Sequence, residues 1–439
     1  MKSDSELLLL AETGDPEAQA DAGILYFEGF IGDCADYEEA IKWFSKSADQ
    51  ECAFGQFWMQ RCLNNGLGIP KDVEKAAEYA QRAFSWLCSK ANQEDAKVQL
   101  YLGYCYQGGV GTTLNLKKAF NWFFKSAKQD NAEAEYNVAM CYAKGLGIEQ
   151  NQLEHYKWIQ RAAKHGNCHS QYDLGMSLLN RQKIDAPDFE EAIKWIRKSA
   201  EQGLASAQYE LGVLLSNSQP EEAIMWWHKA AVRGSIPAMH NLGCSYIEGR
   251  GVAKDPNKAV TYWMQSAMEG WIESMVRLGH CYEQGCGIDR SETTAIAWYQ
   301  KAVETGNIEA AEALFNMDPV YYNDNPLILN IFLNIGRQYQ EGLFIKHSDE
   351  EAFKWVYKAA ELGNSDAQCE LGNYYAQGIG VVQSTIDAEE WYQKAIKQGN
   401  PKAQQALISL NNNRRKGCLM SFTIPITVSI AFLVYKILS

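Results

Sequence analysis

Two short patterns of apolar and polar residues alternate along most of this chain. The first is Leu-Gly-x-x-Tyr-x-x-Gly, as at Leu242, Gly243 and Tyr246. Leu242 and Tyr246 lie four residues apart, so they share one face of a helix. The second pattern is Ala-x-x-Trp-x-x-Lys-Ala-Ala, as around Trp355, and it predicts a second helix with an aromatic anchor. Each unit of the pattern therefore predicts a pair of helices.

The second pattern returns ten times, and most neighbouring anchors are 36 or 37 residues apart. A fixed period of this length is typical of a solenoid built from stacked helical hairpins. We therefore predict an all-α fold, an α-solenoid of about ten two-helix repeats. The anchors are Trp43, Tyr79, Trp122, Trp158, Trp195, Trp226, Tyr262, Trp298, Trp355 and Trp391.

Glycines recur at three places in the predicted hairpins: inside the first helix, after the first helix and after the second. A glycine inside a helix costs roughly 1 kcal/mol against alanine, so the repeated glycine represented by Gly243 predicts a close approach of the second helix. A Gly-x-Gly loop such as Gly249-Arg-Gly251 follows the first helix, and a single glycine such as Gly270 follows the second. Glycine readily takes the left-handed conformation that ends helices, so these positions predict helix ends and not phosphate-binding loops.

The two patterns together resemble the Sel1-like repeats, which are relatives of the tetratricopeptide repeats. The shared motif is Ala-x-x-x-Leu-Gly-x-x-Tyr-x-x-Gly-x-Gly-Val followed by Lys-Ala-x-x-Trp-Tyr-x-Lys-Ala-Ala, and the resemblance covers roughly residues 5–410. It implies a superhelical solenoid that acts as a scaffold or adaptor for protein–protein interactions. We therefore assign residues 1–410 to a Sel1-like repeat solenoid.

The repeats are not uniform. The unit anchored at Tyr79 is degenerate, and the unit anchored at Trp226 has a shortened loop. The step from Trp298 to Trp355 is 57 residues and includes an irregular insertion at about 316–328. This insertion is either a degenerate repeat or extra helix, or a kink or loop that binds a partner, because long insertions in repeat arrays are often functional.

One stripe of positions is a candidate partner-binding surface. If the units stack as tetratricopeptide repeats do, their first helices line a concave wall. The position just before Leu-Gly is polar and mildly acidic, so it favours an extended or helical peptide with basic residues; the alternative is a solvated helix face. The stripe contains Tyr101, Asn137, Asp173, Glu210, Asn241, Arg277, Asn334 and Glu370. We expect the anchors Trp43, Trp122, Trp195 and Trp391 to lie instead in the core between helices.

Charge and cysteine content narrow the function classes. The net charge of −13 argues against nucleic acid as a partner, because nucleic-acid binding requires a basic surface. Cys105, Cys141 and Cys281 occupy equivalent places in their repeats, about 10 Å apart across neighbouring helices, which is too far for a disulfide. We therefore expect free thiols that serve as small packing residues in a reducing compartment.

Catalytic and metal-binding motifs are missing from the sequence. No Gly-x-Ser-x-Gly, His-Glu-x-x-His, Walker loop or Ser-x-x-Lys motif is present, so we expect neither an enzyme nor a cofactor, and a cryptic β-lactamase-like hydrolase is the least favoured function. The best metal candidate is His165-Gly-Asn-Cys168-His169. This segment falls on the turn between two units, with no further ligands at fixed spacing, so we expect no metal site.

The end of the chain has a different composition. A basic linker at 411–416, with Arg414, Arg415 and Lys416, precedes an uncharged run at 417–435, which Lys436 follows. A helix of this length spans about 28 Å, close to the thickness of a bilayer core. We therefore predict a C-terminal transmembrane tail anchor with the repeats in the cytosol, and Cys418 as a possible acylation site. The alternative is a capping or interfacial helix.

The predicted function combines these features. The short acidic N-terminus is a poor match to a signal peptide, which agrees with a cytosolic array. We expect a membrane-tethered scaffold or adaptor that binds a protein or peptide, and a secreted bacterial effector at a host organelle membrane is one form that such a protein takes. The alternative is a resident adaptor at the bacterial inner membrane, within a signalling or envelope complex.

Overall fold

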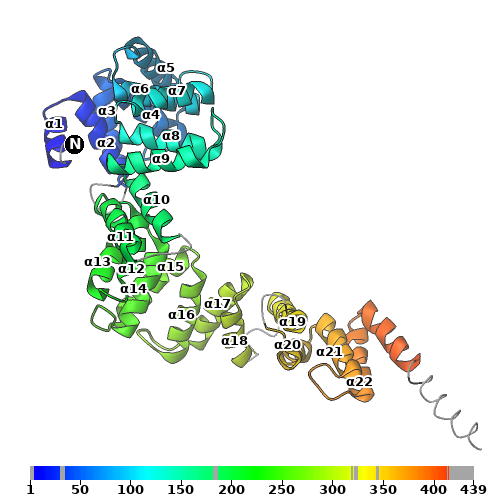
Figure 1. Ribbon diagram of the computed structural model, residues 1–439. Coiled ribbons are helices and arrows are strands. Elements are labelled where there is room, and N and C mark those ends of the chain that lie inside the picture. The colour runs from blue at the N-terminus through cyan, green and yellow to red at the C-terminus, as the bar shows by residue number, and fades with distance from the viewer. Residues whose placement is uncertain are drawn as a thin grey trace, which may run out of the picture. The chain divides into compact units, whose positions relative to one another are not determined.

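The computed structural model describes residues 4–29, 35–180, 186–317, 320, 325–342, 346–412 and 414 (Figure 1). Helices connected by short loops make up this part of the chain, and it contains no strand. The prediction of an all-α solenoid is confirmed. The helices are α1 (Asp4–Glu12), α2 (Pro16–Phe27), α3 (Tyr37–Asp49), α4 (Ala53–Asn65), α5 (Val73–Lys90), α6 (Ala96–Gly108), α7 (Leu116–Ala127), α8 (Ala132–Lys144), α9 (Gln152–Lys164), α10 (Cys168–Leu179), α11 (Ala186–Glu201), α12 (Ala205–Leu215), α13 (Pro220–Val232), α14 (Ile236–Glu248), α15 (Pro256–Met268), α16 (Ile272–Gln284), α17 (Glu292–Glu304), α18 (Ile308–Asn316), α19 (Pro326–Glu341), α20 (Asp349–Glu361), α21 (Ser365–Gln377) and α22 (Thr385–Lys397), with a further helix over 401–412.

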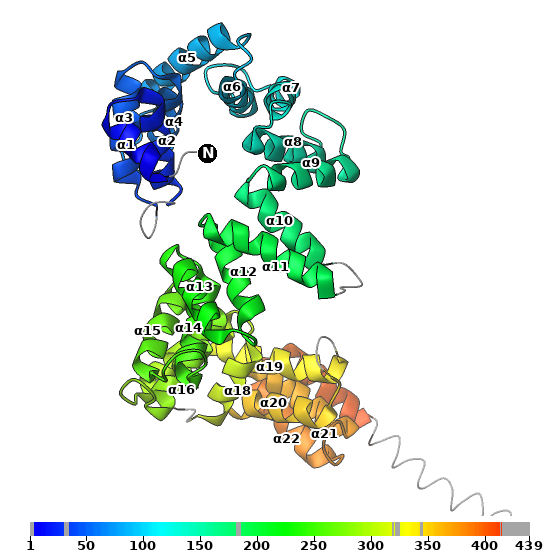
Figure 2. The same ribbon diagram turned by 60° about the vertical axis from the view of Figure 1, so that its left-hand side comes forward.

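The helices pair into hairpins in chain order, from α2–α3 to α16–α17 and then α19–α20 and α21–α22. The extensive contacts join helices that are adjacent or next but one in the sequence. The chain divides into two compact units, Met1–Gln265 and Ser266–Ser439. Figure 2 shows the hairpins of the first unit following one another along a curved path. Within this unit, Arg233, after α13, donates a hydrogen bond to the carbonyl of Gly29, 204 residues earlier.

In eight hairpins of the described part of the chain, a glycine on the first helix contacts a larger residue on the second. A Cβ atom added to Gly103 would lie 2.3 Å from the ring of Phe123, closer than any real contact, so only glycine admits that ring. The position of Phe123 is one residue after the aromatic anchor. The pairs of this kind are Gly23 with Phe44, Gly103 with Phe123, Gly175 with Ile196, Gly212 with Trp227, Gly243 with Trp263, Gly279 with Tyr299, Gly336 with Val356, and Gly372 with Tyr392.

The Gly-x-Gly loops end the first helices and also pack against the preceding hairpin. Gly145 follows α8 with a φ of 69°, in the left-handed region, as the sequence predicts. A Cβ atom added to Gly147 would lie 2.2 Å from the carbonyl oxygen of Leu116, at the start of α7. The second glycine of the loop therefore allows one hairpin to lie directly on the previous one.

The tryptophan anchors are less buried than the sequence suggests. Trp43 is 7% exposed, but Trp122, Trp195 and Trp391 are only partly buried, so their assignment to the core is wrong in part. The residue after each anchor occupies the space opposite the glycine, which turns the anchor ring toward the surface. There a lysine three residues later covers it, with the Lys125 Nζ atom 4.2 Å from the centre of the Trp122 ring.

The long step in the array contains an extra helix. α18 ends at Asn316, and α19 begins at Pro326 after the N-cap residue Asn325. α18 and α19 both pack against α17, and the ring of Phe315 lies 4.9 Å from that of Trp355 in α20. The described part of the long step thus contains α18 as an extra helix, and residues 318–319 and 321–324 of the insertion lie outside the described residues.

The cysteines of the described residues are free. Cys105 and Cys141 are buried, and burial raises the pKa of Cys105 to about 12 and that of Cys141 to about 11. These thiols therefore remain protonated and fill space within the helix pairs.

No helix in the described ranges combines the length and the apolar character needed to cross a bilayer. The predicted anchor at 417–435 lies outside the described residues, as do Arg415, Lys416, Cys418 and Lys436. Arg414 is described and is exposed.

Candidate functional site

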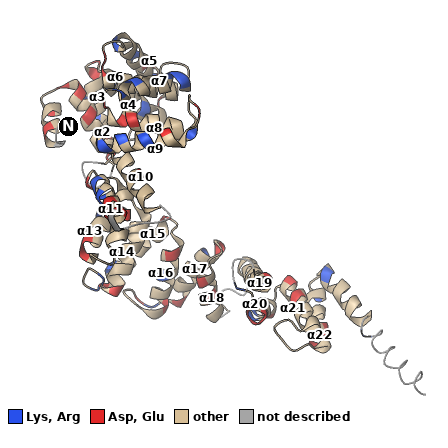
Figure 3. Cartoon of the chain, viewed as in Figure 1, with Lys and Arg blue, Asp and Glu red and all other residues tan. Residues whose placement is uncertain are grey.

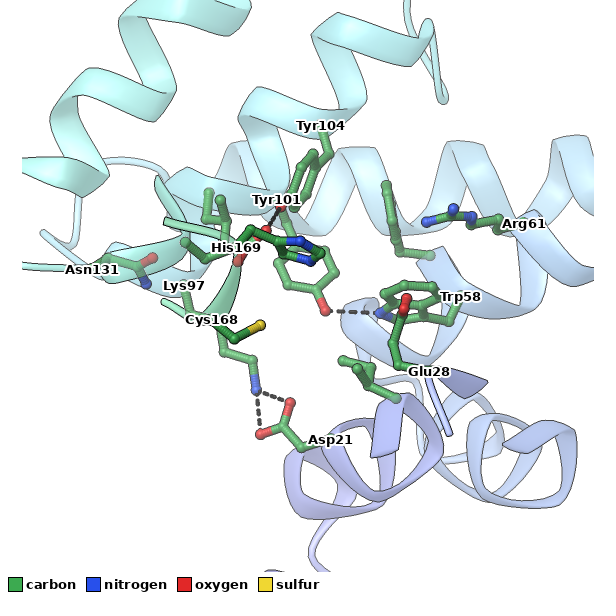
Figure 4. A pocket seen from close by; sticks show the side chains of 14 residues that line it. Asp21, Glu28, Trp58, Arg61, Lys97, Tyr101, Tyr104, Asn131, Cys168 and His169 are labelled. Atoms are coloured by element: carbon green, nitrogen blue, oxygen red, sulfur yellow. Dashed lines mark hydrogen bonds and ion pairs between the residues drawn. The ribbon is translucent and has the colours of Figure 1, made fainter. Parts of the chain in front are cut away.

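The first helices of the first unit enclose a cavity of about 550 Å³ (Figure 4). α2, α4 and α6 contribute most of its wall, and the first turns of α8 and α10 contribute the remainder. The lining residues are Asp21, Ile24, Glu28, Phe57, Trp58, Arg61, Lys97, Leu100, Tyr101, Tyr104, Asn131, Glu133, Cys168 and His169. Because these residues come from five successive repeats, the cavity is a product of their stacking and no single repeat contains it.

Aromatic rings form one side of the cavity. The Trp58 Nε1 atom donates a hydrogen bond of 2.9 Å to the hydroxyl of Tyr101, and the rings of Phe57 and Tyr101 lie 5.1 Å apart, edge to face. Burial raises the pKa of Tyr101, so its hydroxyl stays protonated. The arrangement presents a rigid apolar surface that still carries polar groups at its edge.

Several charged side chains of the cavity are already paired. The Lys97 Nζ atom lies 2.8 Å from Asp21 Oδ1 and 3.8 Å from Glu17 Oε2. Glu133 accepts hydrogen bonds from the Tyr104 hydroxyl, at 3.0 Å, and from the Asn167 side chain, at 2.8 Å. These interactions join helices of different repeats, α6 to α2 through Lys97 and α6 to α8 through Glu133, and so fix the walls of the cavity.

Glu28 differs from these groups. It caps the C-terminal end of α2, and its carboxylate forms no hydrogen bond or ion pair within the described part of the chain. Burial raises the pKa of Glu28, while the positive charges of Arg61 and of His169, when protonated, act in the opposite direction. The Arg61 guanidinium lies over the Trp58 ring, 5.0 Å from its centre. Figure 4 shows Glu28 beside Trp58, at the edge of the cavity.

The predicted stripe meets this cavity at one end. Tyr101 lines it, and the Asn137 side chain donates a hydrogen bond of 3.0 Å to the hydroxyl of Tyr104, which also lines it. Farther along the first unit, Asp173, Glu210 and Asn241 are partly buried. Burial raises the pKa of both Asp173 and Glu210.

The remaining stripe residues belong to the second unit. The Arg277 guanidinium lies 3.7 Å from the carboxylate of Glu309, Asn334 is exposed, and Glu370 binds Arg337 at 2.6 Å. Five of the eight predicted residues therefore belong to the first unit, and three belong to the second.

Most of the residues that line the cavity were not predicted from the sequence. In the first two repeats, Asp21 and Phe57 occupy the position equivalent to Tyr101. One helical turn earlier, the equivalent positions are Lys97, Glu133 and His169. The register itself was therefore the signal, and it was missed because α2 has alanine in place of leucine and α4 has Trp58-Met59 in place of Leu-Gly.

A second cluster of polar groups lies between α8 and α9. Asp130, Glu135 and His165 bring their ligand atoms within 4.8 Å of one another. Arg161 lies among them, with its guanidinium 2.5 Å from Glu135 and 2.6 Å from Asp130, so the cluster is a network of ion pairs. His169, the other histidine of the candidate metal segment, instead stacks on Tyr136, so the two histidines do not share a site.

Comparisons with known proteins agree with the repeat pattern. The family model described as the Sel1 repeat matches residues 16–52, 54–85, 96–131, 132–167, 168–204, 205–235, 236–271, 272–307, 333–364 and 365–400. No curated protein matches the chain.

Two solved structures illustrate the similarity. One is c5321, a protective antigen present in uropathogenic Escherichia coli strains displaying an SLR fold; it is 24% identical, with a TM-score of 0.52 and coverage of 94% of this chain and 91% of that one. The other is a Sel1 repeat protein from Oxalobacter formigenes, which is 26% identical, with a TM-score of 0.41 and coverage of 76% and 93%. The first likeness shows a shared fold and nothing beyond it.

Proposed function

The chain belongs to the Sel1 repeat family, and on this premise we propose that the first-helix surface of its first unit binds a peptide segment of a partner protein. Sel1 repeat proteins are protein-interaction scaffolds. The observation that carries the proposal is the cavity of about 550 Å³ that five successive repeats line. Its volume falls within the range typical of ligand-binding sites, and its mixture of aromatic surface and a few polar groups is typical of them too.

The proposal has a second part, which rests on sequence. The scaffold is tethered to a membrane by residues 417–435, with Arg414, Arg415 and Lys416 on the cytosolic side. A secreted bacterial effector at a host membrane is the first candidate, and a resident bacterial membrane adaptor is the second. In both, the protein acts by holding partners together and not by catalysis. An acyl chain on Cys418 would strengthen the tether.

Photo-cross-linking tests the binding surface. A photoreactive amino acid at Ile24, which lines the cavity, is compared in the full-length protein with the same amino acid at Glu78, an exposed position on α5. We expect a discrete cross-linked partner from position 24 and none from position 78. Equal adducts from both positions, or none from position 24, would overturn the proposed binding surface.

Membrane extraction tests the tether. The full chain and a version ending at Asn412, each fused to a fluorescent protein at the N-terminus, are expressed in a eukaryotic cell and extracted with alkaline carbonate. We expect a carbonate-resistant pellet from the full chain alone. If both forms are fully extracted, the tether is wrong and the soluble scaffold remains.

A further inference from the structure

We propose that the cavity between α2, α4, α6 and α10 accepts a cationic side chain, an arginine or lysine of the partner segment, with the Glu28 carboxylate as its counter-ion. This inference rests on the proposed function, because it identifies the chemistry of the peptide that the same surface binds.

The charged groups that face the cavity differ in whether they already have a partner. Lys97 is engaged by Asp21 at 2.8 Å, and Arg61 lies over Trp58. The Glu28 carboxylate has no ion pair or hydrogen bond in the described ranges, and it lies beside Trp58 at the edge of the cavity (Figure 4). Glu28 is exposed, so its carboxylate is accessible to a ligand, and an anion without an ion partner beside the Trp58 ring attracts a cation.

The second argument is the balance of charge. The lining contains three carboxylates, Asp21, Glu28 and Glu133, and two fixed cations, Arg61 and Lys97. Once Lys97 and Asp21 are paired, two carboxylates face one guanidinium. Figure 3 shows acidic and basic residues interspersed along the helices of the first unit, so complementarity is local and favours one cation at the position of Glu28.

The same surface continues to be acidic beyond the cavity. Asp173 and Glu210 are partly buried on α10 and α12, and the carboxylates of both lack an ion pair within the described part of the chain. Burial raises the pKa of each, which is the sign of a carboxylate without a sufficient counter-charge. A partner segment that extends along these helices therefore gains from further basic residues.

The third argument is the apolar side of the cavity. Ile24, Leu100 and the Trp58 ring lie beside the polar groups. Arginine and lysine have long apolar stems below a charged head, and an aromatic ring beside the head adds a favourable cation–π contact. A cavity of about 550 Å³ is larger than one such side chain, so the occupant is a basic residue with apolar neighbours.

Peptide binding to the full-length protein in a neutral detergent tests the proposal. The probe is a fluorescein-labelled peptide, Gly-Leu-Arg-Leu-Arg-Leu-Gly, and its counterpart carries citrulline in place of arginine. Citrulline retains the shape and loses the charge, so we expect binding that is about tenfold weaker by fluorescence anisotropy. Equal affinity for the two peptides, or no binding of the arginine peptide up to about 1 mM, would overturn the proposal.

A pair of matched variants locates the interaction. Glu28→Gln is expected to weaken the arginine peptide about fivefold and to leave the citrulline peptide unchanged. Glu78→Gln makes the same change in net charge at an exposed position on α5, and it is expected to alter affinity less than about twofold. Thermal unfolding of both variants checks that the fold is intact. An equal effect of the two substitutions shows that binding follows net charge alone, and the proposal then fails.

The two proposals fail in different ways. If cross-linking from position 24 persists while Glu28→Gln behaves like Glu78→Gln, the surface binds its partner without a cation at Glu28. If position 24 gives no cross-linked partner even in the protein that keeps Glu28, the proposed binding surface itself is wrong.

Discussion

The consecutive hairpins α6–α7 and α8–α9 solve the same packing problem with different residues. In the first, Gly103 faces the ring of Phe123, and a Cβ atom there would lie 2.3 Å from it. In the second, Ala139 and Ile159 occupy the equivalent positions, and both are buried. A larger residue on the first helix therefore accompanies a smaller one on the second. What the hairpin requires is the combined volume of the pair, and not a glycine as such.

The same hairpins also differ in a polar contact between their helices. In α6–α7, the Gln129 side chain donates a hydrogen bond of 3.0 Å to Gln99. In α8–α9, Glu135 and His165 take these places, 2.8 Å apart, and Arg161 joins them. Neutral amide pairs recur in other hairpins, at Gln19 with Gln50, Gln171 with Gln202, and Gln368 with Gln398. The α8–α9 hairpin thus carries a charged version of a neutral contact.

The largest expected effect comes from enlarging the residue on the first helix of a hairpin and then making the facing residue on the second helix smaller. Gly103→Val should lower the free energy of unfolding by about 3 kcal/mol, because its side chain overlaps the Phe123 ring. Adding Phe123→Ile, which imitates Ile159, should restore at least about 1 kcal/mol of that loss. Urea unfolding of the two single variants and the double variant measures this coupling. Strict additivity would contradict the account based on combined volume.

The next effect concerns the charged contact. Glu135→Ala should destabilise the chain by about 2 kcal/mol, because it leaves the partly exposed Arg161 and His165 without their shared carboxylate. Glu135→Gln combined with His165→Gln recreates the pair seen in α6–α7 and should cost less than about 1 kcal/mol. Chemical denaturation compares the two. A double variant as unstable as Glu135→Ala would show that the charge is required at this place.

A smaller effect is the pH dependence that the charged contact introduces. Burial raises the pKa of Glu135 above its ordinary value of 4.5, so the folded state binds this proton more tightly than the unfolded state. The contribution of the group is therefore fully present below pH 4.5 and is lost as the pH rises through the raised value. Unfolding from pH 4 to pH 8 should show wild type losing stability relative to Glu135→Gln. A constant difference across this range would refute the prediction.

The smallest effect involves the cations over the anchor rings. Lys125 lies 4.2 Å from the centre of the Trp122 ring in α7, and Arg161 lies 5.2 Å from that of Trp158 in α9. Lys125→Gln should cost about 0.5 kcal/mol, since Lys125 is exposed and has no ion pair within the described residues. Arg161→Gln should cost more, because it also removes the ion pair with Glu135. Equal costs in thermal unfolding would show that the ion pairs contribute nothing.

The sequence predicted the array well because its signals are periodic. The spacing of the anchors and the Gly-x-Gly loops report directly on helix lengths and ends, so the hairpins could be found without a structure. The spacing does not indicate, however, which of the anchor tryptophans are fully buried. Which of two neighbouring aromatic residues faces Gly243 depends on the rotation of the second helix, and here it is Trp263 and not Tyr262.

The candidate site was only partly predictable for a related reason. Tyr101 and Asn137 were found because they keep the register of the Leu-Gly motif. Glu28 occupies a variable position of the motif, just before its last glycine at the end of α2, and Trp58 belongs to a repeat whose motif is altered. Positions of this kind meet only when neighbouring repeats stack, so the curvature of the array decides their contacts and the pattern within a single repeat does not.

The hydrogen bond from Arg233 to Gly29 affects the order in which the first unit assembles. The extensive contacts join helices close in sequence, so each hairpin can form on its neighbour with little loss of chain entropy and at high speed. The link between Arg233 and Gly29 instead requires all the intervening hairpins to be in place. It therefore forms after these hairpins have stacked, and it can open without unfolding any helix.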